Sequence, residues 1–205
     1  MARRRDGLLR RDALLDAALV CFSRANVLEV GIEQVRREAG ASPSSVYNLF
    51  ESMQQITLAL LERTFERLFA HLVARVRQAR GAKAVVTTLV AAHLEWVLAH
   101  RVEARFMYQA TAVEQSPGAS EALGLRKAEM LAPLTAHVAP LVASGALPDW
   151  STLQFDVVVL GPTHEACRRF LAGAPLDVAW MEVELPELAW RAVDSARRRD
   201  KAARD

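Results

Sequence analysis

Side chains that can form hydrogen bonds with another molecule are concentrated between residues 42 and 48. This stretch holds hydroxyl and amide groups that both donate and accept: Ser42, Ser44, Ser45, Tyr47 and Asn48. The apolar residues Val46, Leu49 and Phe50 recur among them at helical spacing. We therefore expect a short helix that turns Ser44, Ser45, Tyr47 and Asn48 outward, where they could meet phosphate oxygens or base edges.

A tight turn between two short helices is expected just before this polar face. The first helix should run over about residues 32–39, and Gly40 should end it because a residue without Cβ adopts the left-handed cap at no steric cost. Ser42 as N-cap and Pro43 at the first helical position are a strong start signal for the second helix. The pattern matches the helix-turn-helix, whose second helix enters the major groove of DNA.

An ordinary helical corner of an all-α protein would show the same local pattern, so the surrounding sequence decides. An amphipathic helix over about residues 8–25 precedes the turn, and a basic arm with Arg3, Arg4 and Arg5 precedes that helix. Ser52 should cap a long helix that follows directly after Phe50. These neighbours favour the DNA-binding interpretation.

With that context, Ala39-Gly40-Ala41-Ser42 followed by Val46-Tyr47-Asn48-Leu49-Phe50 resembles the DNA-binding head of TetR-family (tetracycline-repressor type) regulators. The resemblance is specific over about residues 8–61 and rests on length and helical layout beyond them. It implies an all-α protein with an N-terminal three-helix head that contains the helix-turn-helix. The basic arm and head would occupy residues 1–52, and a larger helical body for ligand binding and dimerisation would occupy residues 53–205.

The resemblance also implies a function, namely a transcriptional regulator, usually a repressor, whose operator binding is modulated by a small, mainly apolar effector. Its partners would be double-stranded operator DNA, the effector, and a second copy bound through the last two helices. Groups near base edges would be Ser42, Pro43, Ser44 and Asn48. Phosphate contacts would come from Ser45, Tyr47 and the cations Arg3, Arg4, Arg5 and Arg36 or Arg37.

The chain departs from the family pattern at three places. Arg36 stands where a small residue is usual, Ser44 where glycine is frequent, and Met53 where a lysine usually reaches a phosphate. The recognition helix therefore has no Lys or Arg, although non-specific DNA affinity rests largely on such cations. A rival interpretation follows: a helical ligand- or partner-binding protein whose head has weakened DNA affinity.

The charge of the chain is local rather than global. The net charge is only +2, so the whole molecule has no strong attraction to nucleic acid. Five arginines lie within the first eleven residues with Asp6 as the single acid among them. A basic arm of this kind often follows a DNA groove or backbone, and a solubilising tail is the alternative.

Residue patterns typical of enzymes and metal sites do not occur in the sequence. The five histidines lie outside any His-Glu-x-x-His motif and away from cysteines at zinc spacing. Gly-rich phosphate loops and nucleophile-elbow motifs are missing, and the carboxylates fit solvated helix faces. We therefore expect no enzyme, no cofactor and no metal site.

The two cysteines and the N-terminal sequence indicate a reduced compartment. Cys21 and Cys167 lie far apart on apolar helical faces, which is typical of small core residues rather than a disulfide. Asp12 and Asp16 interrupt the apolar stretch that follows the basic residues, which argues against a signal peptide. A cytoplasmic location is expected.

The remainder of the chain is expected to be helical, without strands or internal repeats. The expected helices cover about residues 53–80, 83–100, 102–115, 120–144, 151–171 and a last helix after residue 175. Pro133 and Pro140 must kink or divide the fourth of these, and the fifth should be interrupted near Gly161 and Pro162. Asn26 is expected to take the left-handed cap that ends the helix over residues 8–25.

The body holds bulky side chains that could line a ligand pocket. His93, Trp96, Phe106, Tyr108 and His137 are apolar or amphipathic residues on neighbouring helices. Small-molecule pockets are mostly apolar with a few polar groups that fix orientation. These five residues are the candidate ligand-binding set, and packing in a dry core is the alternative for each.

Overall fold

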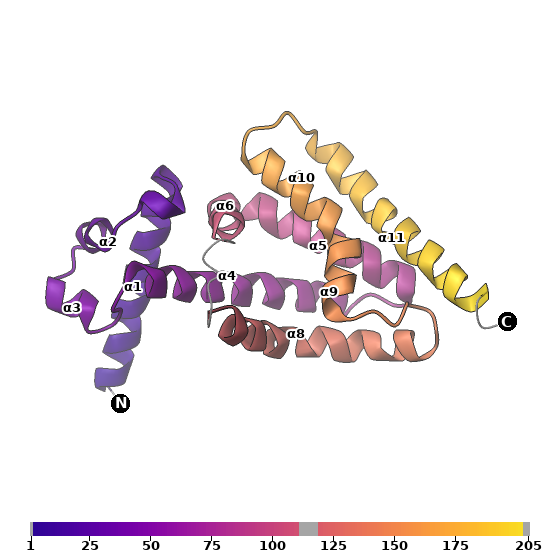
Figure 1. Ribbon diagram of the computed structural model, residues 1–205, viewed down its shortest axis with the longest axis horizontal. Coiled ribbons are helices and arrows are strands. Elements are labelled where there is room, and N and C mark those ends of the chain that lie inside the picture. Colours follow the sequence, from indigo (N-terminus) through magenta and orange to yellow (C-terminus); the bar gives the residue numbers. More distant parts are fainter. Residues whose placement is uncertain (1, 111–118, 203–205) are drawn as a thin grey trace. The chain divides into compact units, whose positions relative to one another are not determined.

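The computed structural model describes residues 2–110 and 119–202, with side chains described for residues 6–110 and 121–199. Every regular element in those ranges is a helix, which confirms the predicted all-α class (Figure 1). The first elements are α1 (Ala2–Arg24), the 3-10 helix η1 (Val27–Glu29), α2 (Ile32–Glu38), α3 (Pro43–Tyr47) and α4 (Met53–Val76). There follow α5 (Ala82–Ala99), α6 (Arg101–Gln109), α8 (Ala119–Ala143), α9 (Thr152–Phe155), the π-helix η2 (Asp156–Leu160), α10 (Gly161–Leu171) and α11 (Val178–Ala202).

The chain divides into two compact units. The first, which we call the head unit, comprises Met1–Glu66 and Val102–Lys127. The second, the body unit, comprises Arg67–Arg101 and Ala128–Asp205. This grouping by compactness differs from the expected functional division at residue 52, which stays a prediction.

The head unit is held together by an apolar core that several helices share. Its buried members include Leu14, Leu15, Ala18 and Phe22 of α1, Val35 of α2, Val46 of α3, Ile56, Leu60 and Leu61 of α4, and Phe106 of α6. The Phe22 and Phe106 rings stack with their centroids 5.0 Å apart. Helices as short as α3 are marginal in isolation, so burial in this core is what keeps α3 folded.

The turn between α2 and α3 has the predicted chemistry. Gly40 has φ +60°, and its N–H donates to the Arg37 carbonyl at 3.1 Å. The Ala41 N–H donates to the Arg36 carbonyl at 3.0 Å, which completes a Schellman motif. Ser42 then caps α3 by accepting from the Ser45 N–H at 3.2 Å. The short connection fixes where α3 begins.

The N-terminal boundaries differ from the sequence expectation at two points. α1 begins at Ala2 instead of residue 8, so the backbone of the basic arm is helical, while the side chains of Arg3, Arg4 and Arg5 lie outside the described residues. The prediction for Asn26 was wrong, because this residue is extended (φ −66°, ψ 146°) and begins η1. Its side chain accepts from the Leu28 N–H at 3.1 Å, a local turn bond that competes with a helix cap.

The body unit is built around α5, which packs against α11 and α10. α5 is long and apolar enough, by length and composition, to cross a membrane. Half of that window is buried in the protein, and the core helix of a soluble protein meets the same test. The observation therefore carries little weight as a sign of a membrane span.

Two prolines stand inside α8 without dividing it. α8 runs unbroken from Ala119 to Ala143 although Pro133 and Pro140 interrupt its hydrogen bonding. Both prolines are exposed, so water can solvate the carbonyls that lose an amide partner. Pro186 also lies inside α11, but it is buried.

The predicted interruption near Gly161 is present as a π-helix. The Gly161 N–H donates to the Asp156 carbonyl, a bond that spans five residues instead of four. Pro162 follows directly and has no N–H to offer the carbonyl four residues earlier. The wider turn of η2 thus lies where a regular hydrogen-bond ladder could not continue.

Candidate nucleic-acid interface

α3 presents a polar face to solvent and an apolar face to the core. Val46 and Phe50 are buried and Leu49 is half-buried, whereas Tyr47 is 50% exposed. Among the polar residues of this segment, Ser42, Ser44 and Asn48 are exposed and Ser45 is half-buried. The exposures of Ser44, Tyr47 and Asn48 agree with the predicted outward face, whereas Ser45 is only partly exposed. The proposed roles in DNA binding stay predictions.

The Ser42 hydroxyl already has two neighbours in the protein. It accepts the Ser45 N–H as the cap of α3 at 3.2 Å and lies 3.2 Å from the Ser44 hydroxyl. A hydroxyl has one proton and two lone pairs, so Ser42 keeps some capacity for a further bond. The end of α3 that carries these hydroxyls is also the end toward which the N–H groups point, and this end favours anions.

The two arginines predicted to contact DNA from α2 have different surroundings. Arg36 donates from Nε to a Glu33 carboxylate oxygen at 2.8 Å and from Nη1 to the Ala41 carbonyl at 3.1 Å. Its side chain is only 25% exposed. Arg37 is exposed and donates to the Glu33 carbonyl at 3.2 Å. Arg37 is therefore better placed than Arg36 to reach an external phosphate.

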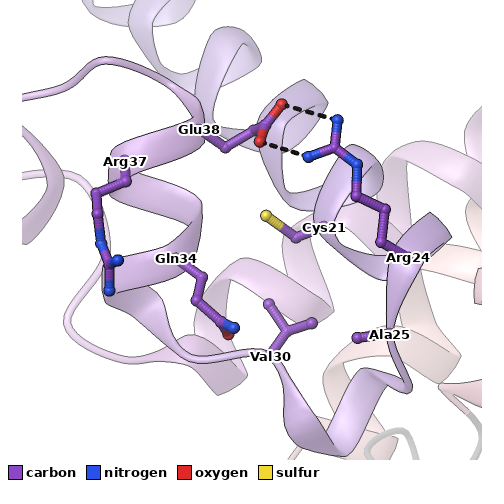
Figure 2. Close-up of a pocket in the computed structure, with 7 residues that line it drawn as sticks. All are labelled: Cys21, Arg24, Ala25, Val30, Gln34, Arg37 and Glu38. Carbon is purple, nitrogen blue, oxygen red and sulfur yellow. Dashed lines mark hydrogen bonds and ion pairs between the residues drawn. The ribbon is translucent and has the colours of Figure 1, made fainter.

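A hollow lies between α1 and α2 on the side of the α2 residues Gln34, Arg37 and Glu38 (Figure 2). The Arg24 guanidinium closes one side of it by donating to both oxygens of Glu38, at 2.8 and 3.5 Å. Gln34 accepts the Gly31 N–H at 2.7 Å and so caps the start of α2. These bonds tie α2 to α1 and to its own N-terminus.

The Cys21 thiol faces this hollow (Figure 2). Burial raises the pKa of Cys21 above its ordinary value, and the Glu38 carboxylate raises it further, while Arg24 acts in the opposite direction. The thiol is the unreactive form of the group. The raised pKa of Cys21 thus favours the thiol form.

The start of α4 is capped by side chains of the preceding segment. The Ser52 hydroxyl accepts the Gln55 N–H at 3.2 Å, as predicted for its N-cap. Gln55 in turn accepts the Glu51 N–H through Oε1 at 2.9 Å. The first turn of α4, which begins at Met53, carries neither an acidic nor a basic side chain.

The five candidate ligand-binding residues do not lie in one compact unit. His93, Trp96 and His137 belong to the body unit, whereas Phe106 and Tyr108 belong to the head unit. Phe106 is 1% exposed and is occupied by its stack on Phe22. Trp96 is buried and stacks on His100 with centroids 5.0 Å apart, and His137 Nε2 lies 3.3 Å from the Ala79 carbonyl. Their role as a ligand site stays a prediction.

A histidine pair in the body unit was not foreseen from the sequence. The rings of His93 on α5 and His164 on α10 meet edge to face, with centroids 4.7 Å apart. His164 Nε2 lies 3.4 Å from an Asp156 carboxylate oxygen. Burial lowers the pKa of His93 well below its ordinary value, and the neighbouring His164 lowers it further. No group of three metal-ligating side chains is found in the described part of the chain.

A family model described as "Bacterial regulatory proteins, tetR family" matches residues 14–60, which span α1 to the first part of α4. The fold of the whole chain is similar to a TetR family transcription regulator from Marinobacter aquaeolei VT8. The TM-score is 0.74 at 18% identity, with 94% of this chain and 98% of that chain covered. Residues 14–60 thus match the tetR family of bacterial regulatory proteins.

Two further proteins are similar to parts or to the fold of this chain. The HTH-type transcriptional regulator BetI of Brucella suis biovar 1 is 29% identical over 83 residues, 40% of this chain and 42% of BetI. The chain thus matches about two fifths of the length of that curated relative. The transcriptional regulator FadR of Bacillus subtilis, solved in complex with stearoyl-CoA, has a TM-score of 0.67 at 14% identity, covering 88% of this chain and 98% of FadR.

Proposed function

We propose that this protein is a dimeric transcriptional regulator that binds operator DNA through α3 and responds to a small, mainly apolar effector. The observation that carries the proposal is the polar face of α3, which is exposed and rests on buried Val46 and Phe50. A helix-turn-helix places such a face in the major groove. A tetR-family regulator that acts on DNA would work in the cytoplasm.

The polar groups of this face divide by the kind of contact they would make. Pro43, Ser44 and Asn48, with the remaining capacity of Ser42, would meet base edges and so read sequence. Tyr47 and the N–H groups at the start of α3 would bind phosphates, which position the protein but carry no sequence information. Ser45 is half-buried and its N–H is engaged with Ser42, which leaves its hydroxyl for a phosphate.

The cations for phosphate binding would come from outside α3, because that helix has no Lys or Arg. Arg37 is exposed at the C-terminal end of α2, and Arg3, Arg4 and Arg5 precede the described side chains of α1. Each phosphate contact contributes about 0.9 to the slope of log affinity against log salt. Replacement of the three arm arginines by Ala should therefore flatten that slope, and an unchanged slope would make the arm a solubilising tail.

Dimerisation would double the contacts of one short helix over two half-sites. α11 exposes Trp180 (46%), Val183 (63%) and Leu188 (42%), and the spacing of three residues puts Trp180 and Val183 on the same side of the helix. Val157 in η2 is 60% exposed and Leu153 in α9 is 71% exposed. Large apolar side chains exposed on the last helices are what a partner surface would cover.

Effector binding would act by favouring one of two arrangements of the protein. The solved complex of FadR with stearoyl-CoA makes an apolar effector a reasonable class for this fold. His93, Trp96 and His137 of the body unit remain the candidate lining, and α4 contributes residues to both units. An effector changes DNA affinity only if it binds the two arrangements with different affinity.

The decisive test is a selection from random duplex DNA, followed by a gel shift with the enriched duplex at low salt. Enrichment of a two-fold symmetric site with half-sites about one helical turn apart supports the proposal, and sedimentation should show two chains per duplex or a multiple of two. A chain that binds acyl-CoA or similar apolar compounds but no DNA at about 50 mM salt would instead be the helical binding protein with a weakened head.

A further inference from the structure

Arg36 bonds both main-chain polar groups of Ala41, across the turn of the helix-turn-helix. The Ala41 N–H donates to the Arg36 carbonyl at 3.0 Å, and the Ala41 carbonyl accepts from Arg36 Nη1 at 3.1 Å. Ala41 immediately precedes Ser42, the N-cap of α3. One residue of α2 thus holds both peptide groups that flank the Cα of Ala41, the residue before the N-cap of α3.

The guanidinium is held in place before it reaches Ala41. Its Nε donates to a Glu33 carboxylate oxygen at 2.8 Å, three residues earlier on the same helix. A partly exposed pair of this kind adds little stability by itself, but it selects the rotamer in which Nη1 faces the Ala41 carbonyl. The planar fork of arginine can serve both acceptors at once, whereas a lysine ammonium offers no such fixed geometry.

Apart from these bonds, the connection between α2 and α3 is held by the burial of Val46 and Phe50. Because α3 has only five residues, few other contacts set its direction.

We infer that Arg36 is a positioning residue that orients α3 through Ala41, and is not one of the cations that bind phosphate. This inference rests on the proposed DNA-binding function only for its effect on affinity. Loss of the brace would leave α3 in its binding orientation for a smaller fraction of the time. The apparent affinity for DNA falls in proportion to the fraction of molecules that hold α3 in the binding orientation, whatever the DNA sequence or the salt concentration.

The experiment compares Arg36→Lys, Arg36→Ala and the neighbouring control Arg37→Ala in the full-length protein. DNA affinity is measured by gel shift at several salt concentrations. Hydrogen exchange of the α3 amides is measured without DNA, and thermal melting confirms that each variant is folded. For a positioning role, both Arg36 variants should bind about tenfold more weakly with an unchanged salt slope, and their α3 amides should exchange faster. Arg37→Ala should lower the slope by about 0.9 and leave exchange unchanged.

The opposite pattern would overturn the inference. If Arg36 binds a phosphate, Arg36→Lys keeps near wild-type affinity, Arg36→Ala lowers the slope by about 0.9, and α3 exchange stays as in the wild type. If Arg36→Ala fails to fold, Arg36→Lys decides alone, because it keeps the charge and loses the fork. If the wild type binds no DNA, the proposed function fails, and α3 exchange in Arg36→Lys still decides whether the brace exists.

Discussion

The His164 ring on α10 meets the His93 ring on α5 at 88°, with ring centroids 4.7 Å apart. His93 is completely buried, and burial together with His164 holds its pKa well below the ordinary value of 6.5. The folded protein therefore keeps His93 neutral at a pH where the unfolded chain already protonates it. This difference links the stability of the protein to pH.

Stability should accordingly fall as the pH drops below about 6.5. The contribution of neutral His93 is fully present above the unfolded pKa and is lost as the pH falls from there toward the folded pKa. The free energy of unfolding should decrease by up to about 1.4 kcal/mol per pH unit from this group. Urea unfolding between pH 7.5 and 5.5 measures it. His93→Gln should remove most of the slope, and an equal slope in the wild type and the variant would show that His93 is not the cause.

Gly40→Ala should destabilise the head by about 1–2 kcal/mol, because the residue has φ +60° and side chains with Cβ are strained there. No heavy atom lies within 4 Å of the Cβ that would be added, so the cost is conformational rather than steric. Gly124→Ala is the matched control, since it also meets open space but lies inside α8. It should stabilise by about 0.5–1 kcal/mol. Equal effects in thermal melts would refute the cap assignment.

Tyr47→Phe should weaken DNA binding about equally on the selected operator and on unrelated duplex. The phenol is exposed on α3, and a lost hydrogen bond to a charged phosphate is worth about 1.5–3 kcal/mol. Gel shifts on both duplexes measure the change. The chain has one other tyrosine, and Tyr108→Phe serves as the control because it lies on α6. Unchanged binding by the Tyr47 variant would reject its phosphate contact.

Trp96→Ala separates a ligand pocket from a dry core. If Trp96 lines a pocket, the substitution should abolish the effect of an apolar effector and largely spare DNA binding without it. That effect in the wild type should be about 2.7 kcal/mol of protection at a hundredfold excess over the dissociation constant, with a 5–150-fold change in operator affinity, typical of allosteric coupling.

A dry core predicts a different result for the same variant. Trp96 is 2% exposed, so Trp96→Ala would then destabilise the body by about 3–5 kcal/mol and impair every property together. Thermal melts and gel shifts with and without a long-chain acyl-CoA distinguish the two outcomes. Trp150→Ala, at a half-buried position of the body unit, controls for the loss of an indole elsewhere.

The helix-turn-helix could be predicted from the sequence because its signals are local. The left-handed Gly40, the Ser42 cap and the apolar spacing of Val46 and Phe50 all involve residues within a few positions of one another. The interruption at Gly161 and Pro162 is local in the same sense, since a missing amide acts on the preceding turn. The prediction of a left-handed cap at Asn26 was wrong because the same side chain can bond the backbone in either a cap or a turn.

The contacts that give individual residues their roles were decided only by the tertiary structure. The positive charge of Arg36 suggested a phosphate ligand, but the fold of the turn brings the Ala41 carbonyl to its guanidinium. His93 and His164 are 71 positions apart in the chain, and no helical spacing relates them. Phe106 was grouped with His93 by residue type, yet packing places it on Phe22 instead. Periodicity states which face of a helix is apolar, whereas the partner of that face depends on how distant helices pack, which no short stretch of sequence encodes.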